Sequence, residues 1–249
     1  MSASSILKVV GHRPWPLPTG PWVMTQAWDD LLFAHWPVPV DALRQIVPSV
    51  LTLDIYEGQA WIGVVPFGIG DFRPRWFPPI PGLSYFPELN VRTYVIAEDK
   101  PGVFFFSLDV NNPLAVVGAR LWFHLPYFLG RMSLRREGDA VHYTSHRTHP
   151  GVQPADFAAS YRPTGNLSTP QPGLEHWLTE RYCLYAVDRR EHVYRGEIHH
   201  VPWSLQSAEA RIAVNTMAPR AIRLPDTAPL LHFSRRQQVL LWPPYRVKP

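Results

Sequence analysis

The sequence predicts a mainly β domain of the α+β class, with two or three short helices. Short runs rich in Val, Ile, Phe, Tyr and Trp alternate with clusters of Gly, Pro, Asp and Asn, which is typical of strands joined by turns. The 28 prolines among 249 residues predict many short connections, and 46% hydrophobic residues are enough to bury a core. Because no composition break or repeat divides the chain, residues 1–249 are expected to form one domain.

Turn residues divide the N-terminal half into two expected hairpins. Glu57 and Gly58 suit a two-residue hairpin turn, and a turn at 98–102 contains a Pro-Gly pair. The proline-rich stretch 72–86 between the hairpins is expected to be a loop, and Pro48 ends a short helix. The expected elements are strands at 31–38, 51–56, 59–67, 89–97 and 103–110, and a helix at 40–46.

The C-terminal half continues in the same way. Pro113 begins a stretch of helix-forming residues, which predicts a helix at 113–124. A Glu-Gly-Asp turn at 137–139 indicates a third hairpin, and 173–180 is expected to be a short helix. The expected strands are 128–135, 140–148, 182–187, 192–199, 205–213, 229–233 and 238–242.

One row of polar side chains is the first candidate site. Strand alternation places Glu88, Asn90, Arg92 and Tyr94 on one face, with apolar residues and a threonine on the other. Apolar runs flank this strand, which predicts a central position with both faces covered. The row therefore lines a polar cavity or, as the alternative, lies at the surface.

Two further groups extend this candidate site. Arg120 and His124 are four residues apart and would share one face of the expected helix, with a solvated pair as the alternative. Because an unpaired arginine is costly in such apolar sequence, Arg120 is expected to pair with Glu88 or Asp109. Asp109 and Ser107 alternate with apolar residues on the next strand, and we expect them to face the first polar row.

The sequence shows few features of a metal site, a cofactor site or a nucleic-acid interface. His142 and His146 share an expected strand face but stand about 13 Å apart, too far for one ion, so only ligands from distant segments could build a metal site. No nucleophile elbow or phosphate loop occurs, and Cys183 is expected to be a buried, inert thiol. The net charge of +4 is scattered, so no nucleic-acid partner is expected, and no metal or cofactor either.

The single cysteine excludes an internal disulfide and favours a reducing compartment. Residues 1–20 lack the apolar stretch of a secretory signal, and no run approaches the roughly 18 apolar residues of a membrane span. We therefore expect a cytoplasmic protein with no membrane partner, with both a monomer and a homo-oligomer left open.

Several motifs together carry a resemblance to a known family. They are PELNVRTYV at 87–95, GVFFFSLD at 102–109, ARLWFHLPY at 119–127, HWPVP at 35–39 and GVVPF at 63–67. In order and spacing they resemble the YqjF-like domain of unknown function. That family is similar in fold to acetoacetate decarboxylase, and this resemblance implies an antiparallel β-barrel-like core around a central cavity.

The resemblance also supplies a test of activity. Acetoacetate decarboxylase forms a Schiff base on a lysine that follows a proline, assisted by a glutamate and an arginine. Here Pro126 is followed by Tyr127, and a phenol cannot condense with a ketone. The chain has only three lysines, at positions 8, 100 and 248, and none suits the role. The resemblance therefore implies no lysine-dependent decarboxylation, with Glu88 as a loose match to the helper glutamate.

Three functions remain at this point. The first is a cavity for a small oxo acid or ketone, in which an arginine binds a carboxylate or enolate and Glu88 or Tyr127 moves a proton, giving a lyase or isomerase. The second is a non-catalytic protein that binds a small molecule, and the third is a buried ion network that only fixes strand register. The expected catalytic residues are Glu88, Arg92 and Tyr127, and the expected ligand-binding residues are Asn90, Asp109, Arg120 and His124.

Overall fold

Strands dominate the structure, a computed structural model that describes residues 2–78 and 85–247. Four helices occur in these ranges: α1 (Ala3–Ile6), α2 (Val40–Arg44), α3 (Pro113–Trp122) and α4 (Leu174–Thr179). The last three confirm the expected helices with small changes at their ends. The unexpected α1 is a single turn capped by Ser2, whose Oγ accepts a hydrogen bond from the backbone N–H of Ser5.

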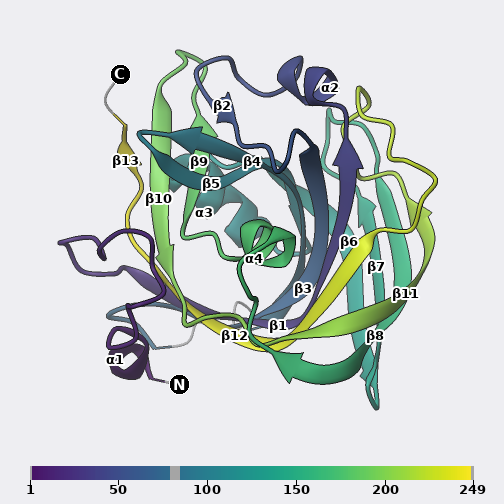
Figure 1. Cartoon of the computed structure of the whole chain (residues 1–249), viewed down its shortest axis with the longest axis horizontal. Helices are drawn as coiled ribbons and strands as arrows, with labels where there is room; N and C mark the ends of the chain where they lie inside the picture. The colour runs from purple at the N-terminus through teal and green to yellow at the C-terminus, as the bar shows by residue number, and fades with distance from the viewer. Residues whose placement is uncertain (1, 79–84, 248–249) are drawn as a thin grey trace.

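The strands form one highly curved sheet (Figure 1). Its order is β13-β10-β9-β5-β6-β7-β8-β11-β12-β1-β3-β4-β2, and β5 also pairs with β4, and β10 with β12. The strands are β1 (Met24–Val38), β2 (Thr52–Leu53), β3 (Ala60–Pro74), β4 (Tyr85–Ala97), β5 (Lys100–Val110), β6 (Tyr127–Glu137), β7 (Ala140–Arg147), β8 (Asp156–Ser168), β9 (Cys183–Val187), β10 (Val193–His199), β11 (Leu205–Asn215), β12 (Leu230–Leu241) and β13 (Tyr245–Arg246).

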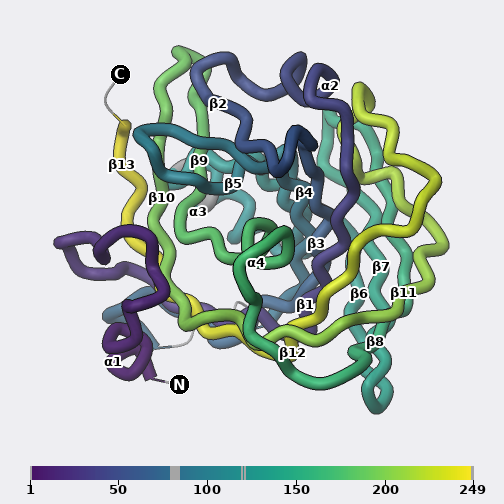
Figure 2. The backbone as a smooth tube through the Cα atoms, in the orientation of Figure 1, coloured from purple at the N-terminus to yellow at the C-terminus, as the bar shows by residue number. Residues whose placement is uncertain are grey.

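The backbone trace shows how the strands wrap around the centre of the molecule (Figure 2). In this view α4 lies in the middle of the surrounding strands, and α3 lies farther from the viewer (Figures 1 and 2). The extra pairings of β4 with β5 and of β10 with β12 bring distant parts of the sheet together. The fold therefore surrounds an interior to which both helices contribute.

The expectation of purely antiparallel strands is wrong at β5. This strand pairs in parallel with both β6 and β9, whereas the other ladders are antiparallel. Parallel neighbours need a long crossover, and α3 supplies it between β5 and β6. This crossover places α3 beside the interior.

The first expected hairpin is also wrong. Apart from one bridge between Tyr56 and Gln59, the stretch 51–56 does not pair with β3, and the short β2 pairs with β4 instead. Leu51 is buried and packs in the same apolar cluster as Val95 of β4. This contact lies next to β2 and is consistent with its pairing to β4.

The turn between β4 and β5 is shorter than expected. Glu98 and Asp99 both have left-handed backbone angles, with φ of 48° and 57°, and form a two-residue turn. Pro101 and Gly102 consequently belong to β5, and the second hairpin is confirmed with longer strands. The expected loop at 72–86 is likewise shortened, since β3 runs to Pro74 and β4 begins at Tyr85; its part at 79–84 lies outside the described residues.

The remaining differences concern the C-terminal half. The third hairpin is confirmed as β6 and β7, whereas the expected strands 229–233 and 238–242 are one continuous strand, β12. Sequence reasoning missed β8, in which Pro163 and Gly165 interrupt the strand pattern, and the two-residue β13. Both missed strands pair along existing ones, β8 with β7 and β11, and β13 with β10.

The central position of β4 is confirmed, because it lies between β3 and β5. Leu89 and Val91 on one face belong to the largest apolar cluster, together with Trp36, Tyr143 and Phe157. The opposite face carries the polar row and meets two other apolar clusters. Both faces of β4 are therefore buried.

A buried ion pair joins β5 to the end of β7. The Asp109 carboxylate, which is fully buried, accepts hydrogen bonds from Nε and Nη2 of Arg147, each at 2.6 Å. The Arg147 guanidinium also lies 4.6 Å from the ring centre of Phe128. This two-pronged pair holds the crossover region of the sheet in register.

Replacing Arg147 by methionine should destabilise the protein by about 3–5 kcal/mol, because it leaves the Asp109 carboxylate buried without its partner. Urea unfolding measures this loss. The matched control is Arg162→Met, which breaks an exposed pair with Glu209 and should cost less than about 1 kcal/mol. Equal losses for the two variants would show that the buried pair has no special role.

Candidate functional site

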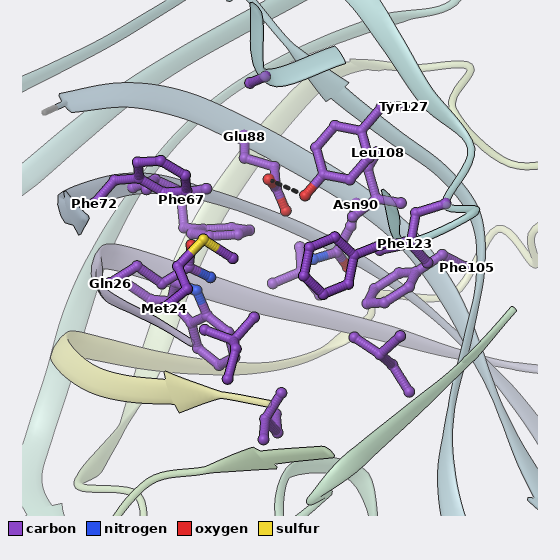
Figure 3. A pocket seen from close by; sticks show the side chains of 18 of the residues that line it. Met24, Gln26, Phe67, Phe72, Glu88, Asn90, Phe105, Leu108, Phe123 and Tyr127 are labelled. Atoms are coloured by element: carbon purple, nitrogen blue, oxygen red, sulfur yellow. Dashed lines mark hydrogen bonds between the residues drawn. The ribbon is translucent and has the colours of Figure 1, made fainter. Parts of the chain in front are cut away.

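The polar row of β4 faces a cavity of about 240 Å³ (Figure 3). Glu88, Asn90 and Arg92 line it, with exposed fractions of 4%, 5% and 9%. Tyr127, at the start of β6, lines it as well. Sequence alternation thus identified the inward face of β4, and four of the seven expected site residues lie around one cavity.

Glu88 and Tyr127 form the first polar contact of the cavity. The Tyr127 hydroxyl donates a hydrogen bond of 2.9 Å to Oε2 of Glu88 (Figure 3). Burial raises the pKa of Glu88 to about 8, with the Asp109 charge adding to the rise and the Tyr127 hydrogen bond opposing it. Burial and the neighbouring Glu88 also raise the pKa of Tyr127. Glu88 is therefore protonated at neutral pH and can give up a proton.

Arg92 is a buried cation with few partners. Its Nη2 donates to the carbonyl oxygen of Leu178 at 3.3 Å, and its guanidinium carbon lies 5.1 Å from the ring centre of Phe33. Its Nε has no hydrogen-bond partner. Among the described residues Arg92 forms no ion pair with a carboxylate, in contrast to Arg147 and Arg181. An anion from outside the chain would therefore find an uncompensated positive charge.

Arg181, two residues before β9, is the second arginine of the cavity and was missed in the sequence. Its Nη1 donates to Oδ2 of Asp54 at 2.5 Å, and its Nε donates to the carbonyl oxygen of Trp177 at 2.6 Å. Burial lowers the pKa of Arg181, and the Asp54 charge opposes that shift. Because Asp54 neutralises Arg181, the net positive charge of the site comes from Arg92.

A buried histidine, His35 of β1, lies on the same face of the sheet as the polar row. Nε2 of His35 lies 2.7 Å from the Tyr94 hydroxyl, which donates to the carbonyl oxygen of Leu178 at 2.8 Å. His35 Nε2 must therefore donate to Tyr94. Burial, then the charge of Arg92, lowers the pKa of His35 well below its usual value, so the ring stays neutral. A side chain at Gly63 would crowd this group, since its Cβ would lie 3.0 Å from the His35 ring.

His200 and Trp28 bring aromatic rings to another part of the wall. Nδ1 of His200 donates to the carbonyl oxygen of Val201 at 2.8 Å, so Nε2 carries the lone pair of the neutral ring. Burial lowers the pKa of His200. Trp203 stacks on Trp28 with ring centres 5.8 Å apart and contacts His200 at 5.1 Å. These rings make a rigid, mostly apolar boundary.

Asp109 does not belong to the cavity, contrary to the sequence prediction. The β4–β5 register changes at a bulge between Val91 and Arg92, so that Asp109 lies opposite Leu89 rather than opposite Glu88. A one-residue change of register turns every later side chain to the other face. Asp109 and Ser107 consequently face the main core, where Asp109 binds Arg147.

Arg120 and His124 also lie apart from the lining, and their expected shared helical face is wrong. α3 ends at Trp122, and His124 follows with a left-handed φ of 54°. Arg120 is exposed and donates to the carbonyl oxygen of Tyr127 at 2.7 Å, so the expected ion pair with Glu88 or Asp109 is wrong. The ring of His124 lies 4.6 Å from that of Tyr194. The third interpretation from the sequence, a buried ion network that would join Arg92 and Arg120 to Glu88 and Asp109, is therefore wrong for these residues.

The sequence contained weak signals for the residues that were missed. His35 lies in the HWPVP motif at 35–39 and Gly63 begins GVVPF, but neither motif shows that the two lie side by side. Arg181 and His200 sit in short connections, where no periodicity predicts direction. Only the fold brings these segments together around the cavity.

The described residues give no geometry for a metal or an imine. They contain no group of three or more His, Cys, Asp or Glu side chains placed to hold a metal ion. The described lysines at positions 8 and 100 do not line the cavity, and Lys248 lies outside the described ranges. No helix in the described part of the chain is long and apolar enough to cross a membrane.

Comparison with known proteins identifies the family. Residues 25–238 match DUF2071, a family of uncharacterised conserved proteins. The chain belongs to this family. It is 51% identical over 229 residues to the uncharacterised protein YqjF of Bacillus subtilis, which covers 91% of this chain and 93% of that protein. The resemblance seen in the sequence motifs is thereby confirmed.

Solved structures show the fold of this DUF2071 protein. Acetoacetate decarboxylase from Legionella pneumophila matches with a TM-score of 0.62 at 14% identity, covering 96% of this chain and 93% of that one. The enduracididine biosynthesis enzyme MppR complexed with pyruvate matches with a TM-score of 0.66 at 13% identity, covering 93% and 92%. At such identity the likeness establishes an acetoacetate decarboxylase-like fold.

The free energy of unfolding of Glu88→Gln, measured relative to that of wild type, should increase as pH rises. In the folded state Glu88 keeps its proton up to a pKa of about 8, whereas the unfolded chain loses it near the ordinary value of 4.5. Wild-type stability therefore falls by about 1.4 kcal/mol per pH unit across this window. Glutamine keeps the oxygen that accepts from Tyr127 and does not titrate.

Urea unfolding at pH 5 and pH 8 measures the difference between Glu88→Gln and wild type. The exposed Glu209→Gln serves as the control and should show no such trend. A Glu88→Gln difference that is the same at both pH values would mean that Glu88 is ionised in the folded protein.

Proposed function

We propose that this DUF2071 protein is an enzyme that binds a small oxo acid or ketone in its central cavity. The reaction is a lyase or isomerase step that proceeds through an enolate, without a Schiff base. The single observation that carries the proposal is the presence of a protonated carboxyl group, Glu88, and an unpaired guanidinium, Arg92, on one face of β4 around one cavity.

Arg92 supplies the binding charge. A guanidinium has five donors, and Arg92 donates to the carbonyl oxygen of Leu178 at 3.3 Å and also interacts with the Tyr94 side chain. A carboxylate or enolate oxygen satisfies the remaining donors and neutralises the charge. Asn90, one pleat away on the same face, has an Oδ1 without a partner and can accept a hydrogen bond from a ligand hydroxyl.

Glu88 supplies the proton. In its protonated form it gives a proton to the carbon of an enolate, which forms a C–H bond and yields the ketone while Glu88 becomes a carboxylate. The hydrogen bond from Tyr127 stabilises that carboxylate. In the reverse direction the carboxylate takes the C–H proton back. A pKa of about 8 is well placed for both directions near neutral pH.

Structural neighbours support the ligand class. MppR is described in complex with pyruvate, and other neighbours are acetoacetate decarboxylases, so carbonyl-containing acids fit this fold in related chains. In this function the curved sheet acts as a barrel-like wall around the ligand, an arrangement that the additional β4–β5 and β10–β12 pairings support. The reaction does not use a Schiff base, because Tyr127 follows Pro126 at the position where acetoacetate decarboxylase has its reactive lysine.

A non-catalytic binding protein is the second candidate. It is favoured by the lining, most of which is apolar and includes Phe33, Phe67, Phe72, Phe86, Phe105 and Phe123. Such a wall binds apolar groups without any chemistry. Turnover at Glu88 separates the two candidates, since only the enzyme needs this residue after binding.

Hydrogen–deuterium exchange at C3 of 2-oxobutanoate tests whether the protein catalyses the proposed proton transfer. Wild type in D₂O should catalyse the exchange, with a rate that rises as pH approaches 8 because the ionised Glu88 is the base for the ketone. Glu88→Gln should lose about 100-fold or more in rate while it still binds the acid. Proton NMR follows the exchange. Binding without exchange in wild type would leave the non-catalytic binding protein as the function, and the absence of both binding and exchange would overturn the oxo-acid enzyme.

A further inference from the structure

The charges around the cavity define one end of its ligand. Asp54 neutralises Arg181, the pKa of Glu88 near 8 keeps that residue neutral at pH 7, and Arg92 has no carboxylate partner among the described residues. One anionic group on the ligand balances this charge, and a second would find no further unpaired arginine or lysine among the described lining residues. The cavity is therefore suited to a monoanion.

The rest of the wall is unsuited to a very small acid. Outside the polar group formed by β4 and Tyr127, the lining consists mainly of aromatic and aliphatic side chains from β1, β3, β5 and the residues after α3. Figure 3 shows Phe67, Phe72, Phe105 and Phe123 arranged around the cavity, together with Met24. A ligand with only a head group would leave these apolar surfaces in contact with water.

The same apolar character continues to the outside. Leu114 and Trp122 of α3 line the cavity and are also 69% and 61% exposed, so the cavity reaches the surface beside this helix. Val117 on the same helix is 56% exposed. The segment 113–128 contains no acidic residue. The exposed apolar side chains of α3 thus extend the apolar wall of the cavity to the surface.

We propose that the ligand is an amphiphilic 2-oxo monocarboxylate, with its carboxylate at Arg92 and an aliphatic or aromatic body of several carbons along the phenylalanine-rich wall toward α3. This inference rests on the proposed function and names the substrate class of the same site. The apolar body contributes most of the affinity, whereas the carboxylate sets orientation and charge specificity. Longer acids are therefore preferred over pyruvate.

A chain-length series tests the inference by calorimetry on the full-length protein at pH 7. The probes are pyruvate, 2-oxobutanoate, 2-oxohexanoate and 2-oxooctanoate. Affinity should rise by about fourfold for each added methylene until the cavity is filled. Ala115 lines the cavity on α3, so Ala115→Phe should shorten the optimal chain by blocking the outer part. Val117→Phe, which adds the same ring to the exposed side of α3, is the control and should leave the series unchanged.

The outcomes separate this inference from the function on which it rests. Affinity that is flat or falls with chain length overturns the amphiphilic ligand and leaves the small oxo-acid enzyme standing. Failure of all four acids to bind overturns the oxo-acid function as well. The wild-type series decides the matter even where Ala115→Phe fails to fold.

Discussion

A buried guanidinium without a counter-ion is the constraint on which the chemistry of this protein depends. Arg92 lies on a central strand, 9% exposed, where removing a charge from water costs several kcal/mol unless a partner compensates it. The protein gives this charge a carbonyl oxygen and an aromatic ring, but no carboxylate among the described residues. In a structural ion network each buried charge has a partner of opposite sign. A site that binds an anion instead leaves its cation without such a partner.

One irregularity of the sheet decides which carboxyl groups face the cavity. If the register at Arg92 and Phe105 continued, Asp109 would stand opposite Glu88 and could supply a negative charge to the cavity. The bulge after this pair turns Asp109 to the other face, where Arg147 binds it. Glu88 is then left in apolar surroundings, and burial keeps it protonated. The single extra residue on β5 thus keeps a second carboxylate out of the cavity.

The sequence carried much of the fold, because alternation and turn residues are local signals. The buried polar face of β4, three of the four helices and two of the three hairpins could be predicted in this way. The face of the sheet on which Asp109 lies could not be predicted, because the bulge is not visible in the hydrophobic pattern of the sequence. The hydrogen-bond partner of Arg92 could not be predicted from the sequence either. Leu178 is 86 residues away, and its carbonyl oxygen is placed only by the packing of α4. Features that depend on long-range packing are therefore the ones that sequence reasoning missed.

The most direct test compares a carboxylate with its neutral amide. Calorimetry with 2-oxohexanoate and 2-oxohexanamide, which have the same shape and apolar body, isolates the role of the Arg92 charge. The carboxylate should bind at least about tenfold more tightly to wild type, and the difference should vanish in Arg92→Met, which should fold at least as stably as wild type because it removes an uncompensated buried charge. Equal binding of acid and amide by wild type would contradict the account, as would an Arg92→Met variant that unfolds.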